Sequence, residues 1–439
     1  MDRMSQGAAV AVRELFFAAA ALIAPRRSVA AIERRQLAGV NAMLAAARAD
    51  VAHYGDPAYA GHLRRLPDLA GLPIVTKAQV RAAPERFHAP ERGWFQTDTT
   101  AGSTGSVLRV RHDAGAYGYH GATLLRRFLR AGCRPWWTIA HLKPFPRPSR
   151  WFQRFGIFRR TVVHAGLPER ELAEAILALR PRVLMGYPVM LRAVLRELTG
   201  DELARLRRSL RLILSESELL TAETRALLGE GFGVPVRDEY SAFEVLTIAT
   251  ECRHGSMHVD ADRVVFEVVD PADGRPVPPG TPGVAVVTHF RERAMPLVRY
   301  RIDDRVAVVP GACPCGSRFG RMRLLDGRIE DSLVLRDGTV VYFGAFAAVT
   351  LKQPGIAEFS VRQDEAGEVT VSLQLDPAAG LGFDEVCDGV RGMLRDLLGF
   401  DLPLHFRRID RLELTPGGKA RLVRSRFRPG APGSAAGPP

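Results

Sequence analysis

A run of small hydroxyl residues and glycines at positions 99–106 is the strongest local signal of binding chemistry. It reads Thr-Thr-Ala-Gly-Ser-Thr-Gly-Ser and differs from the Gly-x-x-x-x-Gly-Lys-Ser/Thr loop of the common nucleotide hydrolases. Glycine permits positive φ angles and lets backbone N–H groups approach phosphate oxygens, while the hydroxyls add donors without bulk. The run predicts a phosphate-binding loop, with a plain flexible loop as the alternative. The residues expected to contact phosphate are Thr100, Gly102, Ser103, Thr104 and Gly105.

Two pairs of cysteine and histidine residues could bind a metal. Cys252 and His258 form a Cys-x5-His pair, and Cys313 and Cys315 form a Cys-x-Cys pair in a turn rich in proline and glycine. Thiolates and imidazole suit tetrahedral Zn²⁺, although the spacing is not that of a standard zinc finger. His254 is a rival ligand, and free thiols kept reduced are the alternative to a metal site. Four protein ligands would close the site, so we expect a structural zinc.

Distant segments must come together to form such sites, and the first 256 residues carry the pattern of an α/β fold. Short apolar stretches alternate with helical ones, which indicates mainly parallel strands packed with helices. We expect helices at 28–50, 115–131, 168–179, 188–208 and 221–231, and strands near 138–141, 161–164, 183–186 and 212–214.

The pattern changes after residue 256. Strands between Gly/Pro turns predict a β-rich subdomain, and from residue 332 the pattern is that of a small α+β domain. We expect a large N-terminal domain over 1–330, a small mobile domain over 331–428 and a disordered tail over 429–439. The expected elements are strands at 264–269, 283–289, 306–309, 333–335, 339–342, 357–362, 368–375 and 405–413, and a helix at 383–397.

The composition is that of a soluble globular protein: of 439 residues, 46% are hydrophobic and 25% are charged. The net charge of +13 suits polyanions such as ATP and coenzyme A, or reflects genome composition. Its arginines are scattered, so nucleic acid is not an expected partner.

Five cysteines are an odd and sparse set for a disulfide framework. The apolar run 15–24 is too short to span a bilayer and predicts an N-terminal helix packed on the body, with a signal peptide or loose membrane contact as alternatives.

Further motifs occur in a set order and together resemble the adenylate-forming superfamily of acyl-CoA synthetases, peptide-synthetase adenylation domains and luciferases. Residues 99–106 are similar to its Ser/Thr-Gly-Ser-Thr-Gly signature. Residues 72–77 (Leu-Pro-Ile-Val-Thr-Lys) and 84–87 (Pro-Glu-Arg-Phe) resemble the phenylacetate-CoA ligase branch and its capsule-biosynthesis relatives. Most members carry a lysine shortly after the loop, where this chain has Arg109, which could substitute as a phosphate cation.

Residues 240–244 (Tyr-Ser-Ala-Phe-Glu) are similar to the family's Tyr-Gly-x-Ser/Thr-Glu motif. The resemblance implies that Tyr240 lies near adenine and that Glu244 binds Mg²⁺, for which a carboxylate is a suitable hard ligand. Ser241 replaces the glycine, and Phe243 replaces the hydroxyl residue that contacts phosphate in relatives.

Two more segments are similar to nucleotide-binding motifs. Residues 215–219 (Ser-Glu-Ser-Glu-Leu) resemble Ser-Gly-Ser/Ala-Glu-Pro-Leu, which implies that Ser215 and Glu216 line the adenine pocket, with Glu216 in place of glycine. Residues 296–304 resemble Pro-Leu-Ile-Arg-Tyr-Arg-Thr-Gly-Asp, with Ile-Asp in place of Thr-Gly. This implies that Asp304 accepts hydrogen bonds from the ribose hydroxyls.

Two segments near the small domain complete the motif order. Residues 326–331 resemble the Gly-Arg-x-Asp-Asp hinge, which implies that Arg328 faces the ATP phosphates and that Asp331 lies where the small domain rotates. Residues 416–419 resemble a Pro-x-Gly-Lys loop, and Lys419 would offset transition-state charge during adenylation.

The resemblance also concerns the acyl pocket and the zinc set. Residues 186–188 (Gly-Tyr-Pro) resemble a segment beside the substrate pocket. Trp136, Trp137 and Phe145 could line that pocket, although core packing is the preferred reading. Some phenylacetate-CoA ligase-like proteins show the same Cys-His-Cys-Cys set. An aryl acid, a fatty acid and an amino acid remain open as substrates.

The resemblance implies a cytoplasmic ligase that adenylates a carboxylic acid with ATP and Mg²⁺ and passes the acyl group to the thiol of coenzyme A. One alternative is another acceptor: a carrier protein, an amine, or a cofactor kept as its adenylate. A second is a non-catalytic binding protein, which the substitutions at Glu216, Ser241, Phe243 and Asp303 keep open. The oligomeric state is left open.

Overall fold

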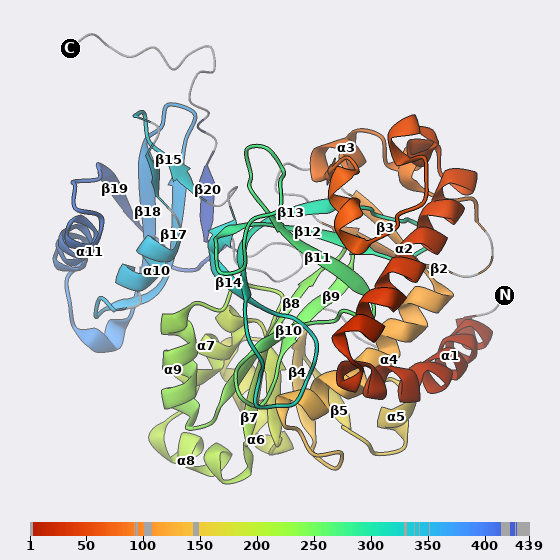
Figure 1. The fold of residues 1–439 in the computed structure, drawn as a ribbon. Coiled ribbons are helices and arrows are strands. Elements are labelled where there is room, and N and C mark those ends of the chain that lie inside the picture. The colour runs from red at the N-terminus through yellow and green to blue at the C-terminus, as the bar shows by residue number, and fades with distance from the viewer. Residues whose placement is uncertain are drawn as a thin grey trace. The chain divides into compact units, whose positions relative to one another are not determined.

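The computed structural model describes residues 3–91, 93, 95–100, 108–143, 149–328, 332–337, 339–341, 343–350, 352–413, 422–425 and 427 (Figure 1). Backbone contacts divide the chain into two compact units. The large unit comprises Met1–Glu218 and Phe232–Leu324, and the small unit comprises Leu219–Gly231 and Leu325–Pro439.

Five parallel strands form one half of a twelve-stranded sheet in the order β5-β4-β6-β7-β8. The strands β6 and β7 are buried along their whole length, as expected for strands covered on both faces. This half confirms the predicted α/β class, and its carboxyl ends form one edge where ligands bind in such sheets. The strands are β4 (Ile139–Lys143), β5 (Arg160–His164), β6 (Val183–Gly186), β7 (Leu212–Glu216) and β8 (Val236–Ala242).

The predicted helices of this part are present, except that one of them is divided, and the short helix α5 was not predicted. The segment 188–208 is two helices, α7 (Pro188–Glu197) and α8 (Gly200–Ser209). The Thr199 side chain accepts from the Glu202 N–H, and the Glu202 carboxylate accepts from the Thr199 N–H. This capping box starts a new helix, so the prediction of one helix was wrong. The others are α4 (Ala114–Ala131), α5 (Trp151–Arg154), α6 (Glu169–Leu179) and α9 (Ala222–Phe232).

Mainly antiparallel strands continue the sheet beyond β8 in the order β9, β10, β14, β13, β12 and β11 (Figure 1). The strand predicted at 306–309 begins earlier, at Tyr300, and β1 pairs with its start in parallel. The strands are β1 (Val75–Thr76), β9 (Leu246–Glu251), β10 (Met257–Val259), β11 (Val264–Val269), β12 (Gly283–His289), β13 (Tyr300–Val309) and β14 (Arg321–Arg328).

A separate antiparallel hairpin flanks the predicted phosphate loop. It consists of β2 (Phe95–Thr100) and β3 (Leu108–Asp113), and Thr100 pairs with Leu108. The sequence did not predict these strands. Residues 101–107, which include most of the predicted loop, lie outside the described residues.

The N-terminal segment is helical, as predicted. Helix α1 (Arg3–Ile23) packs along α4, and its Glu14 is almost fully buried in an ion pair with Arg150. Helix α2 (Val29–Asp50) follows, and α3 (Lys77–Ala82) comes directly after β1. Among the described residues, no helix is long and apolar enough to cross a membrane.

The small unit has the predicted α+β composition. Its sheet has the order β19-β18-β17-β20 and shares an apolar core with α10 and α11. The strand predicted at 405–413 ends at Arg408, and α10 was not predicted. The elements are β15 (Leu333–Val334), β16 (Val340–Val341), α10 (Phe343–Thr350), β17 (Ile356–Gln363), β18 (Val369–Leu375), α11 (Phe383–Leu398), β19 (Leu404–Arg408) and β20 (Val423–Ser425).

Candidate active site and metal centre

Glu244, the predicted Mg²⁺ ligand, lies in the turn between β8 and β9, with its side chain 5% exposed. The Lys77 ammonium lies 3.0 Å from Glu244 Oε1, and the Tyr300 hydroxyl donates to the same oxygen at 3.1 Å. Burial raises the pKa of Glu244, but the Lys77 charge and hydrogen bonds to the carboxylate outweigh burial and lower the pKa below its ordinary value. The side chain is therefore an ionised carboxylate, as a hard metal ligand must be.

Lys77 is a candidate functional residue that sequence reasoning missed. It is the first residue of α3, and Thr76 caps this helix by accepting from the Gln79 N–H. Strand β1 holds the segment in place, because Thr76 pairs with Arg301 next to Tyr300. The rarity of lysine could have drawn attention to this residue, since the arginine-rich chain has only four lysines: Lys77, Lys143, Lys352 and Lys419.

The two residues predicted to contact adenosine lie side by side. The Tyr240 hydroxyl, from β8, donates to Asp304 Oδ2, on β13, at 2.8 Å, and both residues are buried. Asp303 has a φ of 66°, the left-handed conformation that a glycine would adopt easily. Aspartate tolerates this conformation better than most residues. The Gly-to-Asp departure at this position is therefore compatible with the left-handed backbone.

Glu216 ends β7 inside a buried cluster of charges. Its carboxylate lies 2.7 Å from His141 Nε2, 2.5 Å from Lys143 Nζ and 3.5 Å from an Arg127 nitrogen. The neighbouring Glu239 on β8 pairs with the same arginine at 2.5 Å. Burial raises the pKa of Glu216, but Lys143 and His141 outweigh burial and hold it well below its ordinary value. This glutamate is therefore the centre of an ion cluster at the carboxyl end of β7.

The four predicted zinc ligands converge from separate segments. All four donor atoms lie within 4.8 Å of one another. Cys252 Sγ is 3.8 Å from Cys313 Sγ, and Cys315 Sγ is 3.3 Å from His258 Nε2. Ligands at about 2.3 Å for sulfur and about 2.0 Å for nitrogen in a tetrahedron require separations of about 3.5–3.8 Å. The donor set therefore fits Zn²⁺, and the rival His254 is not part of it.

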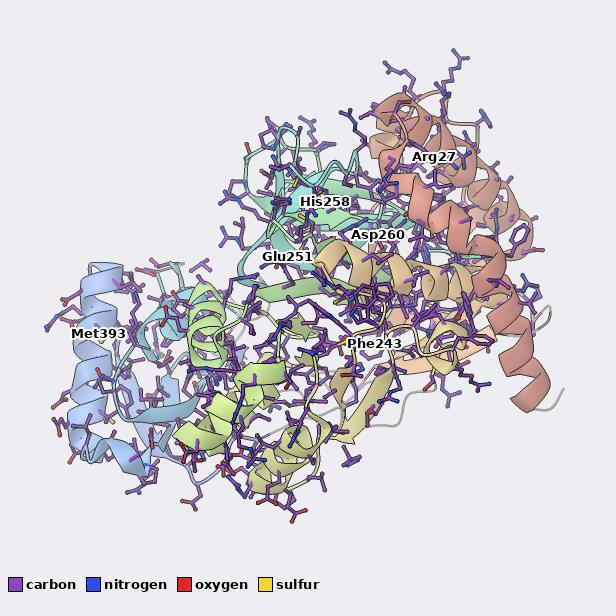
Figure 2. The ribbon with its side chains drawn as sticks, turned by 90° about the horizontal axis from the view of Figure 1, so that it is seen from below. Arg27, Phe243, Glu251, His258, Asp260 and Met393 are labelled. Carbon is purple, nitrogen blue, oxygen red and sulfur yellow. The ribbon has the colours of Figure 1, made fainter. Side chains whose placement is uncertain are left out.

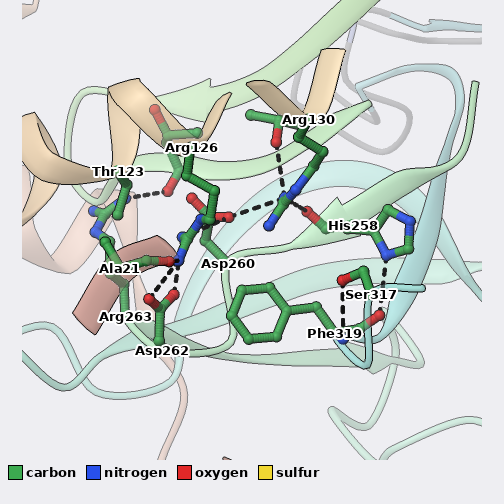
Figure 3. Close-up of polar contacts among 12 residues, drawn as sticks. Ala21, Thr123, Arg126, Arg130, His258, Asp260, Asp262, Arg263, Ser317 and Phe319 are labelled. Carbon is green, nitrogen blue, oxygen red and sulfur yellow. Dashed lines mark hydrogen bonds and ion pairs between the residues drawn. The ribbon is translucent and has the colours of Figure 1, made fainter. Parts of the chain in front are cut away.

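His258 and Cys313 suit a metal in their orientation and pKa, whereas burial and the neighbouring Cys313 raise the pKa of Cys315 to about 11. His258 Nδ1 donates to the Phe319 carbonyl at 3.1 Å, which leaves Nε2 free to bind, as is usual for ligating histidines (Figure 3). Burial raises the pKa of the Cys313 thiol, but hydrogen bonds from Cys315 and Ser256 outweigh burial and lower it to about 7. A thiolate is therefore accessible near neutral pH.

Helix α4 braces this centre through buried arginines (Figure 3). Arg130 pairs with Asp260 at 3.2 Å, and Arg126 pairs with Asp262 at 2.6 Å. Both guanidinium groups lie over the Phe319 ring, that of Arg126 at 5.1 Å and that of Arg130 at 5.5 Å from the ring centroid. The cysteine and histidine turns are thus tied to the helix that also supplies Arg127.

Comparisons with known proteins agree with this geometry. The chain is 28% identical over 305 residues to a phenylacetate-coenzyme A ligase of Thermus thermophilus, which covers 67% of this chain and 68% of that protein. It is 24% identical over 395 residues to the enzyme of that name from Aromatoleum evansii, with 82% and 86% covered. Protein CapK of Staphylococcus aureus is 24% identical over 247 residues, or 56% of this chain and 53% of CapK. No family model matches.

Solved structures share the fold. A 2-hydroxyisobutyryl-CoA ligase in the postadenylation state matches with a TM-score of 0.76 at 18% identity, covering 92% of both chains. The anthranilate CoA ligase AuaEII matches with a TM-score of 0.55 at 18% identity over 74% of this chain and 65% of that chain.

By sequence the chain is thus similar to phenylacetate-coenzyme A ligases and to CapK, and it shares the fold of the solved CoA ligases.

Several residues predicted to belong to the site lie outside the described part. They are Gly102, Ser103, Thr104, Gly105, Asp331, Lys419 and the aromatic Phe145. Thr100 ends β2 and Arg328 ends β14, but the structure describes only their backbones. Their predicted roles therefore stay predictions.

The two neighbouring tryptophans, Trp136 and Trp137, differ in their exposure. Trp137 packs partly buried against the core around β4, β6 and β7, as preferred. Trp136 is 69% exposed, so the preferred expectation that it packs in the core was wrong. Trp136 follows α4 in a turn on the surface. The Arg134 guanidinium lies over its ring, 5.8 Å from the ring centroid.

Proposed function

We propose that this chain joins ATP to a carboxylic acid and then transfers the acyl group to the thiol of coenzyme A. In the first step a carboxylate oxygen attacks the α-phosphorus, the bond to the bridging oxygen breaks, and pyrophosphate leaves. In the second step the thiol sulfur attacks the acyl carbon, its proton passes to solvent, and AMP leaves. ATP and coenzyme A are available in the cytoplasm, where we expect the reaction to occur.

The arrangement around Glu244 is the observation that carries this proposal. A buried, ionised carboxylate lies beside Lys77 and Tyr300, and Tyr240 on β8 donates a hydrogen bond to Asp304 on β13. These residues come from three motifs that are distant in the chain, and the sheet brings them to one place. A carboxylate, a cation and a ribose-binding acid are the groups that adenylation requires.

Each residue has a proposed role in the first step. Glu244 would hold Mg²⁺, which when bound offsets charge on the ATP phosphates. Lys77, which neutralises Glu244 in this structure, would then turn its ammonium toward the phosphates. Asp304 would accept from the ribose hydroxyls, with Tyr240 orienting its carboxylate. Binding the nucleotide at several points orients the α-phosphate for attack.

The loops beyond the described residues complete the proposed site. Thr100 and residues 102–105 would donate to the phosphates, with Ser215 and Glu216 near the adenine. Arg328 and Lys419 would offset charge in the transition state. The small domain, over 331–428, would rotate between the two steps about a junction at Asp331.

We further propose that Cys252, His258, Cys313 and Cys315 hold a structural zinc. The fit of their separations to a tetrahedron supports this. Zinc would fix the turn after β9 to the turn after β13, and so brace the strands that carry Glu244 and Asp304. The ion supplies no chemistry to the reaction, because four protein ligands leave no open position.

AMP formation that requires both an acid and coenzyme A tests the whole reaction. Purified protein is incubated with ATP, Mg²⁺ and each acid of a panel that includes aryl, fatty, hydroxy and amino acids. We expect one class of acid to give AMP and an acyl thioester when coenzyme A is added. Pyrophosphate release without any effect of coenzyme A would identify another acceptor, such as a carrier protein or an amine. ATP that stays intact with every acid would contradict the proposal.

A further inference from the structure

A fully buried histidine and glutamate, His112 and Glu292, lie between the nucleotide motifs and belong to none of them. We infer that they are a positioning pair: they hold the main chain beside Glu244 in the conformation that binds Mg²⁺. The inference rests on the proposed function, since it concerns the metal ligand of that site. Both ring nitrogens of His112 and both oxygens of Glu292 make contacts that support it.

His112 connects the phosphate-loop hairpin to the Glu244 turn. It lies on β3, the strand that follows the predicted phosphate loop. Its Nε2 lies 2.9 Å from the carbonyl oxygen of Phe243, and its Nδ1 lies 2.8 Å from Glu292 Oε2. A carbonyl only accepts hydrogen bonds, so Nε2 must carry a proton and donate. The side chain of His112 therefore holds the peptide group that joins Phe243 to Glu244.

Glu292 fixes the orientation of that imidazole. Its Oε1 accepts from three backbone N–H groups, those of Asp113 at 2.9 Å, Arg293 at 3.0 Å and Ala294 at 2.9 Å. These three bonds hold Oε1 in place, and Oε2 faces His112. The segment 292–294 leads directly into the motif that carries Tyr300 and Asp304. One pair of side chains thus joins the phosphate-loop strand, the Glu244 turn and the ribose motif.

A buried arginine holds the other side of the same turn. Arg263, fully buried, donates to the carbonyl oxygens of Val245 at 2.9 Å and Thr247 at 2.6 Å. The carbonyls of Phe243 and Val245, on either side of Glu244, are therefore both held by nitrogen donors. Figure 2 marks Phe243, whose side chain is 38% exposed and cannot replace the hydroxyl group that relatives have here. In this chain the main chain, and not that side chain, defines the turn.

The pair is better explained by positioning than by a metal of its own. His112, His289 and Glu292 have donor atoms within 4.8 Å of one another. His289 Nε2, however, lies 3.4 Å from the Arg263 guanidinium, a cation that would repel a metal ion. Both nitrogens of His112 already have acceptors beside them. His112 and Glu292 therefore form a hydrogen-bonded pair, His289 contacts Arg263, and the three residues are not a second metal centre.

Two substitutions of His112 separate its two contacts. A glutamine amide reaches the place of Nε2, and an asparagine amide reaches the place of Nδ1. His112→Gln therefore keeps the bond to the Phe243 carbonyl, while His112→Asn keeps only the bond to Glu292. We expect His112→Asn to raise the Mg²⁺ concentration for half-maximal pyrophosphate exchange by about five- to ten-fold, and His112→Gln by about two-fold or less. Calorimetric binding of ATP with Mg²⁺ should show the same ranking.

The outcomes decide the inference. Unchanged Mg²⁺ dependence in both variants, with only a lower melting temperature, would overturn it, because a merely structural residue behaves in that way. Equal effects of the two variants would also overturn it. Should His112→Asn not fold, Glu292→Asp withdraws the carboxylate from His112 and is expected to raise the Mg²⁺ requirement. If the wild type does not exchange pyrophosphate with any of the acids tested, the proposed function fails, and the calorimetric ranking still decides the inference. Absence of Mg²⁺-dependent ATP binding would overturn both.

Discussion

Replacing Lys77 by methionine tests whether the ammonium keeps Glu244 ionised. The two charges lie 3.0 Å apart, and their side chains are 25% and 5% exposed. At an effective dielectric constant of about 20, such charges attract by about 5 kcal/mol, and desolvation of both groups offsets part of this. Removing one partner leaves the other charge buried. We therefore expect Lys77→Met to lower the free energy of unfolding by about 3 kcal/mol near neutral pH.

The loss of stability in Lys77→Met should depend on pH, because it depends on the ionisation of Glu244. Burial raises the pKa of Glu244, but Lys77 and the hydrogen bonds to the carboxylate outweigh burial in the wild type and lower it. The resulting stabilisation is fully present above the unfolded pKa of about 4.3 and is lost as the pH falls through the lower folded pKa. In Lys77→Met burial dominates, so the pKa of Glu244 rises. The difference in stability between the two proteins should therefore be largest at about pH 8 and shrink as the pH falls from the raised pKa of the variant to the lowered pKa of the wild type.

Urea unfolding of both proteins at several pH values measures this difference. Lys352→Met is the matched control, because Lys352 is an exposed lysine, and it should change stability by no more than about 0.5 kcal/mol. The double variant Lys77→Met, Glu244→Gln should recover part of the loss, since no charge then remains buried without its partner. A loss that is equal at acid and neutral pH, or no loss at neutral pH, would refute the reasoning.

Three further predictions concern other parts of the site. Lys419→Ala should abolish adenylation but largely spare thioester formation from a preformed acyl-adenylate; persisting adenylation would show that its proposed role is wrong. Protein purified without added zinc should contain about one equivalent by metal analysis, and Cys313→Ser should lose it and melt at a lower temperature. Glu216→Ala leaves Lys143 and Arg127 buried without their shared carboxylate, so denaturant unfolding should show a loss of about 3 kcal/mol or more. A loss under about 1 kcal/mol would mean that water screens the cluster.

Local patterns predicted the parallel half of the sheet well. Residues 183–186 and 212–214 are short apolar runs between helices, and a strand buried on both faces leaves that mark in the sequence. The hairpin β2–β3 carries no such mark, because its first strand is Phe-Gln-Thr-Asp-Thr-Thr. The break between α7 and α8 could have been predicted, since Thr199 and Glu202 have the spacing of a capping box.

The candidate site was predictable only where a motif carried it. Glu244, Tyr240, Asp304 and the zinc ligands follow from motifs, and the structure brings Tyr240 to Asp304 and the zinc ligands to one another. The partners of Glu244 did not follow, because Lys77 reaches it through the pairing of β1 with β13, which joins segments far apart in the chain. Such long-range pairing has no local signal.

The same limit applies to the charges around Glu216. In the sequence this residue appears only as a glutamate in place of the glycine of the similar motif. Its meaning depends on His141 and Lys143 on β4 and on Arg127 on α4, all of which lie on other elements. Only the order of the strands shows that one buried carboxylate faces all three.

Acid-dependent exchange of labelled pyrophosphate into ATP tests the central claim most directly, because it reports adenylation without any acceptor. The wild type is assayed with Mg²⁺ over a panel of carboxylic acids, with Lys419→Ala as the control. We predict exchange with one class of acid, no exchange without acid, and little or none in the control. No exchange with any acid, together with no binding of ATP by calorimetry, would contradict the claim that this chain is an adenylate-forming enzyme.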